Sequence, residues 1–303
     1  MGGSAESPKL SDLAKHEVLL KLDNLQPAGS FKIRGIGRLV QKAKLDGKKT
    51  AVASSAGNAG MAAAYACAKS GLPCSVFLPK STPDFAAANI SEHGAEVIYH
   101  GEIWDEANEE AMKKLVDDSV LYIHPFNHPV IWEGHASLVD ELVTQLKGKK
   151  PGLVICAVGG GGLLMGVLID VPVLAMETNG TDSLNQSMKT GVLATLPAID
   201  SIAKSLGTKS VAAEVFEAAK SYPGGVISKV CHDTEAIQSV KNFLAHHKFF
   251  VEPSCGAALA ATYFADKYLS DIQIGEGPIV NVVCGGSSVS YEMISYWEEN
   301  AKS

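Results

Sequence analysis

The 303-residue chain contains no apolar run that approaches the ~20 residues of a membrane-spanning helix. Basic residues are also scarce, because 26 lysines and arginines stand against 33 acidic residues and leave a net charge of −7. Nucleic acids and anionic membranes require a basic face, so we expect neither as a partner. Met1 to Leu10 lack the charged-then-apolar pattern of a signal peptide, which predicts a cytoplasmic protein.

The six cysteines show neither the paired spacing of a metal site nor the setting of a disulfide framework. Such frameworks belong to small secreted chains, whereas these cysteines lie mostly inside apolar segments, so we expect reduced thiols. His124 and His128 are four residues apart, but Pro125 between them disfavours a shared helical face. No metal-binding pair is therefore expected there.

Short runs rich in valine and isoleucine alternate with longer helical stretches, which is typical of an α/β fold. The expected strands are 50–53, 74–78, 96–99, 121–124, 153–158, 171–176 and 279–284. The alanine-rich segment Asn58–Ser70 predicts a helix that ends at Gly71. Ser81 to Asp84 predict an N-cap with Pro83 in the first turn of the next helix.

No linker or repeat marks a domain boundary, so the boundaries follow from the alternation of elements. Breaks near Gln26 and His128 give a small domain, 26–128, and a large domain made of 1–25 and 129–303. One connection is unusually short, because only residues 162–169 separate the glycines after strand 153–158 from the next strand. A crossover normally takes ~10–12 residues or more, which suggests that residues are missing after Ile169.

Lys32 follows a turn that contains Pro27 and Gly29, and it lies between Phe31 and Ile33. A lysine picked at random is most often a solvated surface residue. Here the apolar neighbours favour the neutral amine, which is the form that makes Schiff bases. The segment therefore indicates a reactive lysine without establishing one.

A polar loop, 54–58, joins the strand 50–53 to the following helix. Open α/β sheets bind ligands at such carboxyl ends of strands. The hydroxyls of Ser54 and Ser55 and the free backbone N–H groups suit an anion such as a substrate carboxylate. An ordinary capped turn explains the same five residues equally well.

Four successive glycines follow the strand 153–158, namely Gly159, Gly160, Gly161 and Gly162. Glycine runs are costly in conformational entropy, and a simple loop does not need them. They let several backbone N–H groups converge on one anion, which predicts a phosphate site. The pattern matches neither a triphosphate loop nor a dinucleotide fingerprint.

Cys284 ends the last expected strand, beside Gly285 and Gly286, which permit close approach of a ligand. By itself a small buried cysteine is the simpler interpretation.

Taken together, these segments resemble the serine/threonine dehydratases, and closely the mammalian-type members, among the tryptophan-synthase-β-like (fold type II) pyridoxal-phosphate enzymes. The resemblance runs from about Leu22 to the end of the chain. The motifs that carry it are 29–35, 54–58, 131–136, 159–162, 176–178, 251–253 and 283–286. It implies two open, twisted, mostly parallel sheets flanked by helices. The N-terminal segment departs from the family, because it lacks the usual Thr-Pro-Leu stretch.

The resemblance also implies roles for matching residues toward the cofactor, pyridoxal 5′-phosphate. Lys32 would hold it covalently and, once displaced, act as the base at the substrate Cα. Phe31 would stack on its ring, Asn58 would hydrogen-bond the ring's 3′-oxygen, and Cys284 would face the ring nitrogen. The four glycines would bind its phosphate.

On the substrate side, Ser55, Ala56, Gly57 and Asn58 would hold the carboxylate. A potassium-type monovalent cation is implied as well, with Glu177 and a backbone carbonyl near Leu206 as ligands.

The implied reaction is β-elimination, which converts L-serine to pyruvate and ammonia and L-threonine to 2-oxobutyrate and ammonia. The resemblance places it in a cytoplasmic homodimer of amino-acid metabolism and gluconeogenesis. A serine racemase or a sulfhydrylase of the same fold is the nearest alternative. Ala56 favours the dehydratase, because resembling racemases carry a serine there. An NAD-dependent oxidoreductase and a non-catalytic binding protein are more distant alternatives.

Overall fold

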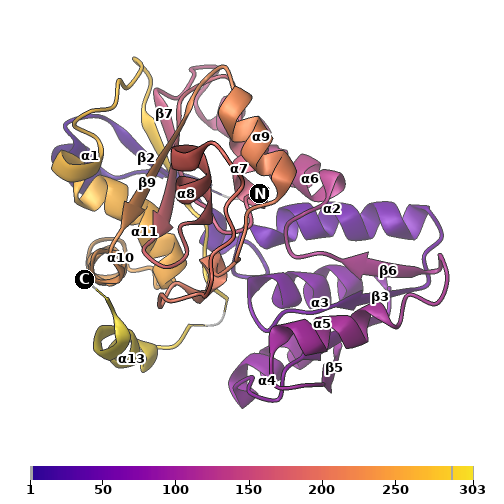
Figure 1. Ribbon diagram of the computed structural model, residues 1–303. Coiled ribbons are helices and arrows are strands. Elements are labelled where there is room, and N and C mark those ends of the chain that lie inside the picture. The colour runs from indigo at the N-terminus through magenta and orange to yellow at the C-terminus, as the bar shows by residue number, and fades with distance from the viewer. Residues whose placement is uncertain (1–2, 288, 303) are drawn as a thin grey trace. The chain divides into compact units, whose positions relative to one another are not determined.

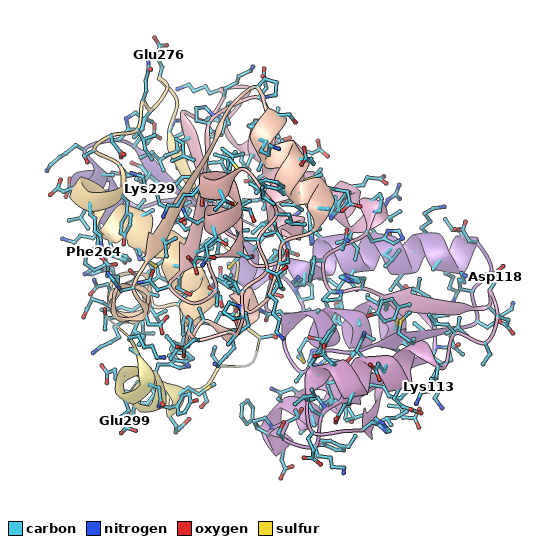
Figure 2. The ribbon with its side chains drawn as sticks, in the orientation of Figure 1. Lys113, Asp118, Lys229, Phe264, Glu276 and Glu299 are labelled. Carbon is cyan, nitrogen blue, oxygen red and sulfur yellow. The ribbon has the colours of Figure 1, made fainter. Side chains whose placement is uncertain are left out.

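The computed structural model describes residues 3–287 and 289–302 (Figure 1). These divide into two compact units, with unit 2 formed by Gln26–His135 and unit 1 by Met1–Leu25 and Ala136–Ser303. The second boundary falls within helix α6 (Pro129–Gln145). Charged side chains such as Lys113, Asp118, Glu276 and Glu299 are exposed and project from the ribbon (Figure 2).

Unit 2 contains a four-stranded parallel sheet in the order β5-β4-β3-β6. Its strands are β3 (Thr50–Ala53), β4 (Cys74–Leu78), β5 (Glu96–Tyr99) and β6 (Val120–Ile123). Its helices are α2 (Lys32–Leu45), α3 (Asn58–Ser70), α4 (Asp84–Glu92) and α5 (Trp104–Met112). Alternate residues of β3 enter two separate cores. Ala51 and Ala53 pack with α2 and α3, whereas Val52 packs with α5.

Unit 1 contains a six-stranded sheet in the order β1-β2-β10-β7-β8-β9. Its strands are β1 (Gly3–Glu6), β2 (Val18–Leu22), β7 (Leu153–Ala157), β8 (Val173–Thr178), β9 (Val226–Cys231) and β10 (Ile279–Val283). Only β1 is antiparallel to its neighbour. Every residue of β7, β8 and β10 is buried, as expected for parallel strands covered on both faces.

The helices of unit 1 flank this sheet. Besides the second half of α6 they are α1 (Pro8–Ala14), α7 (Gly162–Val167), α8 (Ser183–Thr190), α9 (Ala213–Ser221), α10 (Asp233–His247), α11 (Pro253–Tyr263), α12 (Ala265–Tyr268) and α13 (Met293–Asn300). Two 3-10 turns, η1 (Asp23–Leu25) and η2 (Lys204–Leu206), complete the described elements. All residues of α11 are buried, so this helix is part of the core. None of the helices in the described segments is long and apolar enough to cross a membrane.

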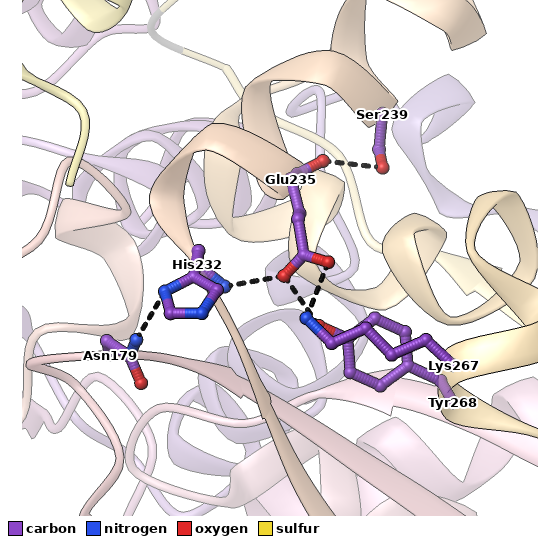
Figure 3. Close-up of polar contacts among 6 residues, drawn as sticks. All are labelled: Asn179, His232, Glu235, Ser239, Lys267 and Tyr268. Carbon is purple, nitrogen blue, oxygen red and sulfur yellow. Dashed lines mark hydrogen bonds and ion pairs between the residues drawn. The ribbon is translucent and has the colours of Figure 1, made fainter. Parts of the chain in front are cut away.

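Helix α10 is anchored at its first turn by a polar cluster (Figure 3). Glu235 at the third helical position accepts the backbone N–H of His232 at 2.9 Å, which completes a capping box. The same carboxylate accepts Lys267 Nζ at 2.7 Å and the Tyr268 hydroxyl at 2.6 Å. Asn179, which follows β8, bonds the His232 ring at 2.8 Å. The cluster therefore joins α10, α12 and the end of β8.

The α/β architecture with two mostly parallel sheets is confirmed. The expected strands 50–53, 74–78 and 96–99 have the observed bounds, and the other four differ by one or two residues. Helix α3 also has the expected bounds and ends at Gly71, whose φ of 62° is left-handed. Strands β1, β2 and β9 were not predicted.

The predicted start of α4 is wrong. Pro83 is itself the N-cap and no side chain caps the helix, so proline does not occupy the first turn. The Thr82 hydroxyl is buried without a hydrogen-bond partner.

In unit 1 the short crossover from β7 to β8 is formed by the residues that the sequence contains. Helix α7 has six residues, and Asp170 with φ 63° turns the chain toward β8. The suggestion that residues are missing after Ile169 stays a prediction, which the mass of the intact protein tests against 31.8 kDa.

Candidate active site

Lys32 is the first residue of α2, and its amine lies at the carboxyl end of the sheet of unit 2. Its Nζ donates a hydrogen bond of 2.5 Å to the carbonyl of Pro125, two residues beyond β6. The same nitrogen is 5.2 Å from the centre of the Phe31 ring. Ile33 packs against the core on the other side. The structure thus gives Lys32 the half-buried, largely apolar surroundings expected from the sequence.

Two histidines follow β6, and the ring of each accepts hydrogen bonds from backbone N–H groups. His124 Nδ1 accepts the N–H groups of Phe126 and Asn127, and His128 Nδ1 accepts that of Val130. Burial, then the charge of Lys32, lowers the pKa of His124 to about 4. His124 is therefore neutral at physiological pH. Among the described residues no group of three or more histidine, cysteine or acidic side chains is placed to hold a metal.

His135 belongs to the motif 131–136, but no role was predicted for it from the sequence. It is fully buried in α6, and its ring centre lies 4.9 Å from that of Phe31. Its Cε1 would be 2.7 Å from a Cβ at Gly35, so the imidazole covers the first turn of α2. Neither ring nitrogen has a hydrogen-bond partner. Burial lowers the pKa of His135 well below its usual value, and Lys32 and Arg34 add to the shift.

The loop 54–58 follows β3, which pairs with β6, so the loop and the Lys32 amine lie at the ends of neighbouring strands. Ser55 Oγ accepts the N–H of Gly57 at 3.3 Å. Ala56 is half-buried and packs against the core of unit 2. Ser54 is almost fully buried, and its hydroxyl has no partner. Asn58 begins α3, so the loop ends at a helix N-terminus that suits an anion.

In unit 1 the four glycines follow β7, and the last of them, Gly162, begins α7. None of their backbone N–H groups donates a hydrogen bond within the described part of the chain. Gly161 has a φ of 89°, and a Cβ there would lie 2.4 Å from Cγ1 of Val215. A Cβ at Gly159 would lie 2.9 Å from Cα of Leu206. Four unpaired donors without side chains, at a helix start, fit a phosphate group.

Cys284 follows β10, which pairs with β7, so it ends on the same side of the sheet as the glycines. The thiol is buried. The neighbouring Cys255 thiol and burial raise the pKa of Cys284 well above its usual value. A neutral thiol at this place can make only a weak hydrogen bond to a ring nitrogen.

Glu177 near the end of β8 is fully buried. Its carboxylate accepts the N–H groups of Leu184 and Asn185 at 2.9 and 2.7 Å, at the start of α8. Burial raises the pKa of Glu177 to about 8, and these two hydrogen bonds oppose the shift. Leu206 packs on Gly159, and its carbonyl accepts the N–H of Thr208 at 2.7 Å.

Each sheet thus gathers one group of predicted residues at its carboxyl edge. Unit 2 gathers Lys32 and the loop 54–58, and unit 1 gathers the glycines, Cys284 and Glu177. Sequence reasoning included His135 in the motif 131–136 without giving it a role, and it missed Trp104, whose indole Nε1 donates to the carbonyl of Ser54. The partner of each residue lies in a segment distant in the chain, so no local pattern reveals these contacts.

Comparison with known proteins shows the family of the chain. The pyridoxal-phosphate dependent enzyme family matches residues 5–285. A mouse protein named serine dehydratase-like is 45% identical, over 95% of this chain and 91% of its own. A bovine L-serine dehydratase/L-threonine deaminase is 44% identical, over 94% and 90%.

A solved structure agrees as well. The fungal L-serine ammonia-lyase from Rhizomucor miehei superimposes with a TM-score of 0.90 at 32% identity, covering 99% of this chain and 98% of that one. A maize serine racemase, at a TM-score of 0.87 and 24% identity, shares the fold. The chain described here belongs to the pyridoxal-phosphate dependent enzyme family.

Proposed function

We propose that the protein is a pyridoxal-phosphate-dependent ammonia-lyase that dehydrates and deaminates L-serine and L-threonine. The relatives named above, at 44–45% identity over most of the chain, support this assignment. The arrangement of residues in each unit is compatible with it. L-serine would give pyruvate and ammonia, and L-threonine would give 2-oxobutyrate and ammonia.

Holding the cofactor would fall to the residues that the resemblance implies. Lys32 would bind it covalently through Nζ, giving up the hydrogen bond to Pro125. Phe31 would stack on its ring and Asn58 would hydrogen-bond the 3′-oxygen. The four N–H groups of the glycines would bind the phosphate, and Cys284 would face the ring nitrogen. Unit 2 would thus serve as the substrate-loop domain and unit 1 as the main cofactor-binding domain.

The bound cofactor supplies an electron sink next to the substrate Cα. Lys32 would also be the base that takes the Cα proton, on Nζ. Ser55, Ala56, Gly57 and Asn58 would hold the substrate carboxylate through backbone N–H groups and side chains. The neutral Cys284 thiol would be only a weak hydrogen-bond donor toward the ring nitrogen, so it would not stabilise a positive charge there as a carboxylate would.

Ala56 is the single observation that favours dehydration over racemisation. Racemisation needs a proton donor on each face of the planar carbanion, and Lys32 covers only one. The Ala56 side chain packs with the core and carries no titratable proton. The nearest hydroxyl, Ser55 Oγ, already accepts the N–H of Gly57.

A monovalent cation of the potassium type would bind near Glu177 and the Leu206 carbonyl. The described contacts of the buried Glu177 carboxylate are N–H and hydroxyl donors without a cationic group. A buried carboxylate of this kind gains from a nearby cation. We expect K+ to raise both activity and melting temperature relative to tetramethylammonium, and Glu177→Gln to remove the difference. Equal values in the two salts would count against the site.

The test of function is an assay of pyruvate and 2-oxobutyrate with both amino acids and added cofactor. Lys32→Ala is the control, and chiral chromatography measures any D-serine. Failure to form either oxo acid, or D-serine as the main product, would contradict the proposal. The homodimer, the cytoplasmic location and the role in gluconeogenesis stay predictions.

A further inference from the structure

The loop 54–58 is attached on its outer side to a tryptophan that lies far away in the sequence. Trp104 Nε1 donates a hydrogen bond of 2.8 Å to the carbonyl of Ser54. Trp104 is the first residue of α5, and 43% of its surface is exposed. The indole is therefore not an ordinary core side chain, and within the described residues its one polar contact is with this loop.

The opposite side of the loop is fixed by close packing on α3. A Cβ at Gly60 would lie only 1.9 Å from the carbonyl oxygen of Ser55, so the loop backbone rests directly on the helix. The Ser54 hydroxyl faces the interior without a partner and cannot hold the loop. Trp104 is thus the polar attachment that holds the Ser54 carbonyl, and hence the peptide plane that leads into 55–58.

The position of the indole is itself set by the turn before α5. Gly101 has a φ of 69°, and its carbonyl accepts the N–H of Lys80 at 2.9 Å. The N–H of Glu102 donates to the Glu106 carboxylate at 2.6 Å, which closes the first turn of the helix. Trp104 therefore comes from a preformed turn, and a preformed donor orients its acceptor at little entropic cost.

We propose that Trp104 is a positioning residue that orients the loop 54–58 and thereby sets the affinity for the substrate carboxylate. It acts through the Ser54 carbonyl and touches no reacting atom. The assignment of the loop to the carboxylate rests on the proposed function, whereas the attachment of the loop by Trp104 does not.

The same unit offers a matched comparison. Trp132 Nε1 donates to the carbonyl of Phe126, also at 2.8 Å. That segment follows β6 and includes Pro125, whose carbonyl accepts the Lys32 amine. Each tryptophan thus holds a different loop with the same kind of hydrogen bond. Replacement by phenylalanine removes the donor from either loop and keeps an aromatic ring.

The experiment uses the full chain loaded with cofactor and compares Trp104→Phe with Trp132→Phe. Loss of one neutral hydrogen bond corresponds to about 3–10-fold in an equilibrium constant. We expect Trp104→Phe to raise KM for L-serine by about that factor with kcat within about twofold. Trp132→Phe is expected to change kcat more than KM, because it loosens the segment that faces Lys32.

Hydrogen exchange of the backbone amides, followed by peptide mass spectrometry, gives a second readout that does not depend on turnover. Trp104→Phe should speed exchange in 55–58, and Trp132→Phe should speed it in 126–128 instead. Unchanged exchange in 55–58, or a kcat loss without a KM change in Trp104→Phe, would overturn the proposal. If the wild type forms no oxo acid, the proposed function fails, while the exchange result still decides the role of Trp104.

Discussion

The carboxyl edges of the two sheets carry different kinds of chemical groups. In unit 2 the groups are side chains, namely the amine of Lys32, the hydroxyl of Ser55 and the amide of Asn58. In unit 1 they are mainly backbone N–H groups of four glycines, with a neutral thiol at Cys284. A site made of side chains fails when a group is removed, whereas a site made of backbone fails when a group is added. We therefore expect function to be lost when a side chain is removed in unit 2 and when a side chain is added in unit 1.

The largest effect is expected from Lys32→Ala in unit 2. Loss of the amine removes both the covalent attachment and the proton acceptor, so turnover should fall by at least about 10³-fold. The visible absorbance of the attached cofactor should disappear as well. Lys42→Ala on the same helix is the control, because Lys42 makes only an exposed ion pair with Asp46. Retained absorbance in Lys32→Ala, lost instead on replacing another lysine, would refute the assignment.

In unit 1 the matching test adds a side chain. Gly160→Val should weaken cofactor binding by more than about tenfold, because a β-branched residue blocks the approach of phosphate to the N–H groups. Gly161→Val should also lower stability by about 1–3 kcal/mol, since its φ is 89° and Val215 lies in the way. Fluorescence titration with cofactor and thermal melts separate the two effects. An unchanged dissociation constant in both variants would exclude the phosphate site.

A smaller effect is expected when a group is added to unit 2. Ala56→Ser places a hydroxyl on the loop 54–58, where it could serve as a second proton donor. We expect a loss of L-serine turnover of less than about tenfold and the appearance of slow D-serine formation. Chiral chromatography after incubation with L-serine measures it. Substantial D-serine from the unchanged protein would show that another residue already covers that face.

The smallest effect is expected from Cys284→Ser in unit 1. The thiol keeps its proton at physiological pH, because its pKa is raised well above 9.0, and a serine hydroxyl is neutral as well. The two proteins should have kcat values within about threefold. Their pH profiles should coincide below pH 9.0. An inflection in that range, present with cysteine and absent with serine, would mean that the thiolate takes part.

Much of the fold was predictable where a strand is a short, mostly apolar run. Strands β3, β4 and β5 have this character, and their bounds were predicted correctly. Strand β1 has the sequence Gly-Ser-Ala-Glu with every residue exposed, so only its pairing with β2 makes it a strand. In β2 the buried Lys21 interrupts the apolar pattern, and its charge is met by Glu141 at 2.5 Å. Such tertiary partners leave no local signal.

The candidate site shows the same division. The sequence singled out the loop 54–58 and the glycines because each has a distinctive composition at the end of a strand, and Lys32 because apolar neighbours flank it after a turn. The roles of Trp104 and His135 could not be predicted, because each contacts a backbone or ring that is distant in the sequence. Trp104 contacts the Ser54 carbonyl and His135 contacts the Phe31 ring, and only the folded structure shows these contacts.

The strand order in unit 1 also has a consequence for synthesis of the chain. Strand β10, the last in sequence, lies between β2 and β7, so β2 cannot gain its parallel neighbour until residues 279–283 have left the ribosome. At about 5–20 residues per second, this wait is on the order of 10–50 s. Unit 2 is continuous in sequence, and its strands are all available once residue 135 has emerged. Nascent chains that stop before 279 would therefore leave one edge of β2 unpaired, with β1 on its other edge, which makes this edge a target for chaperones.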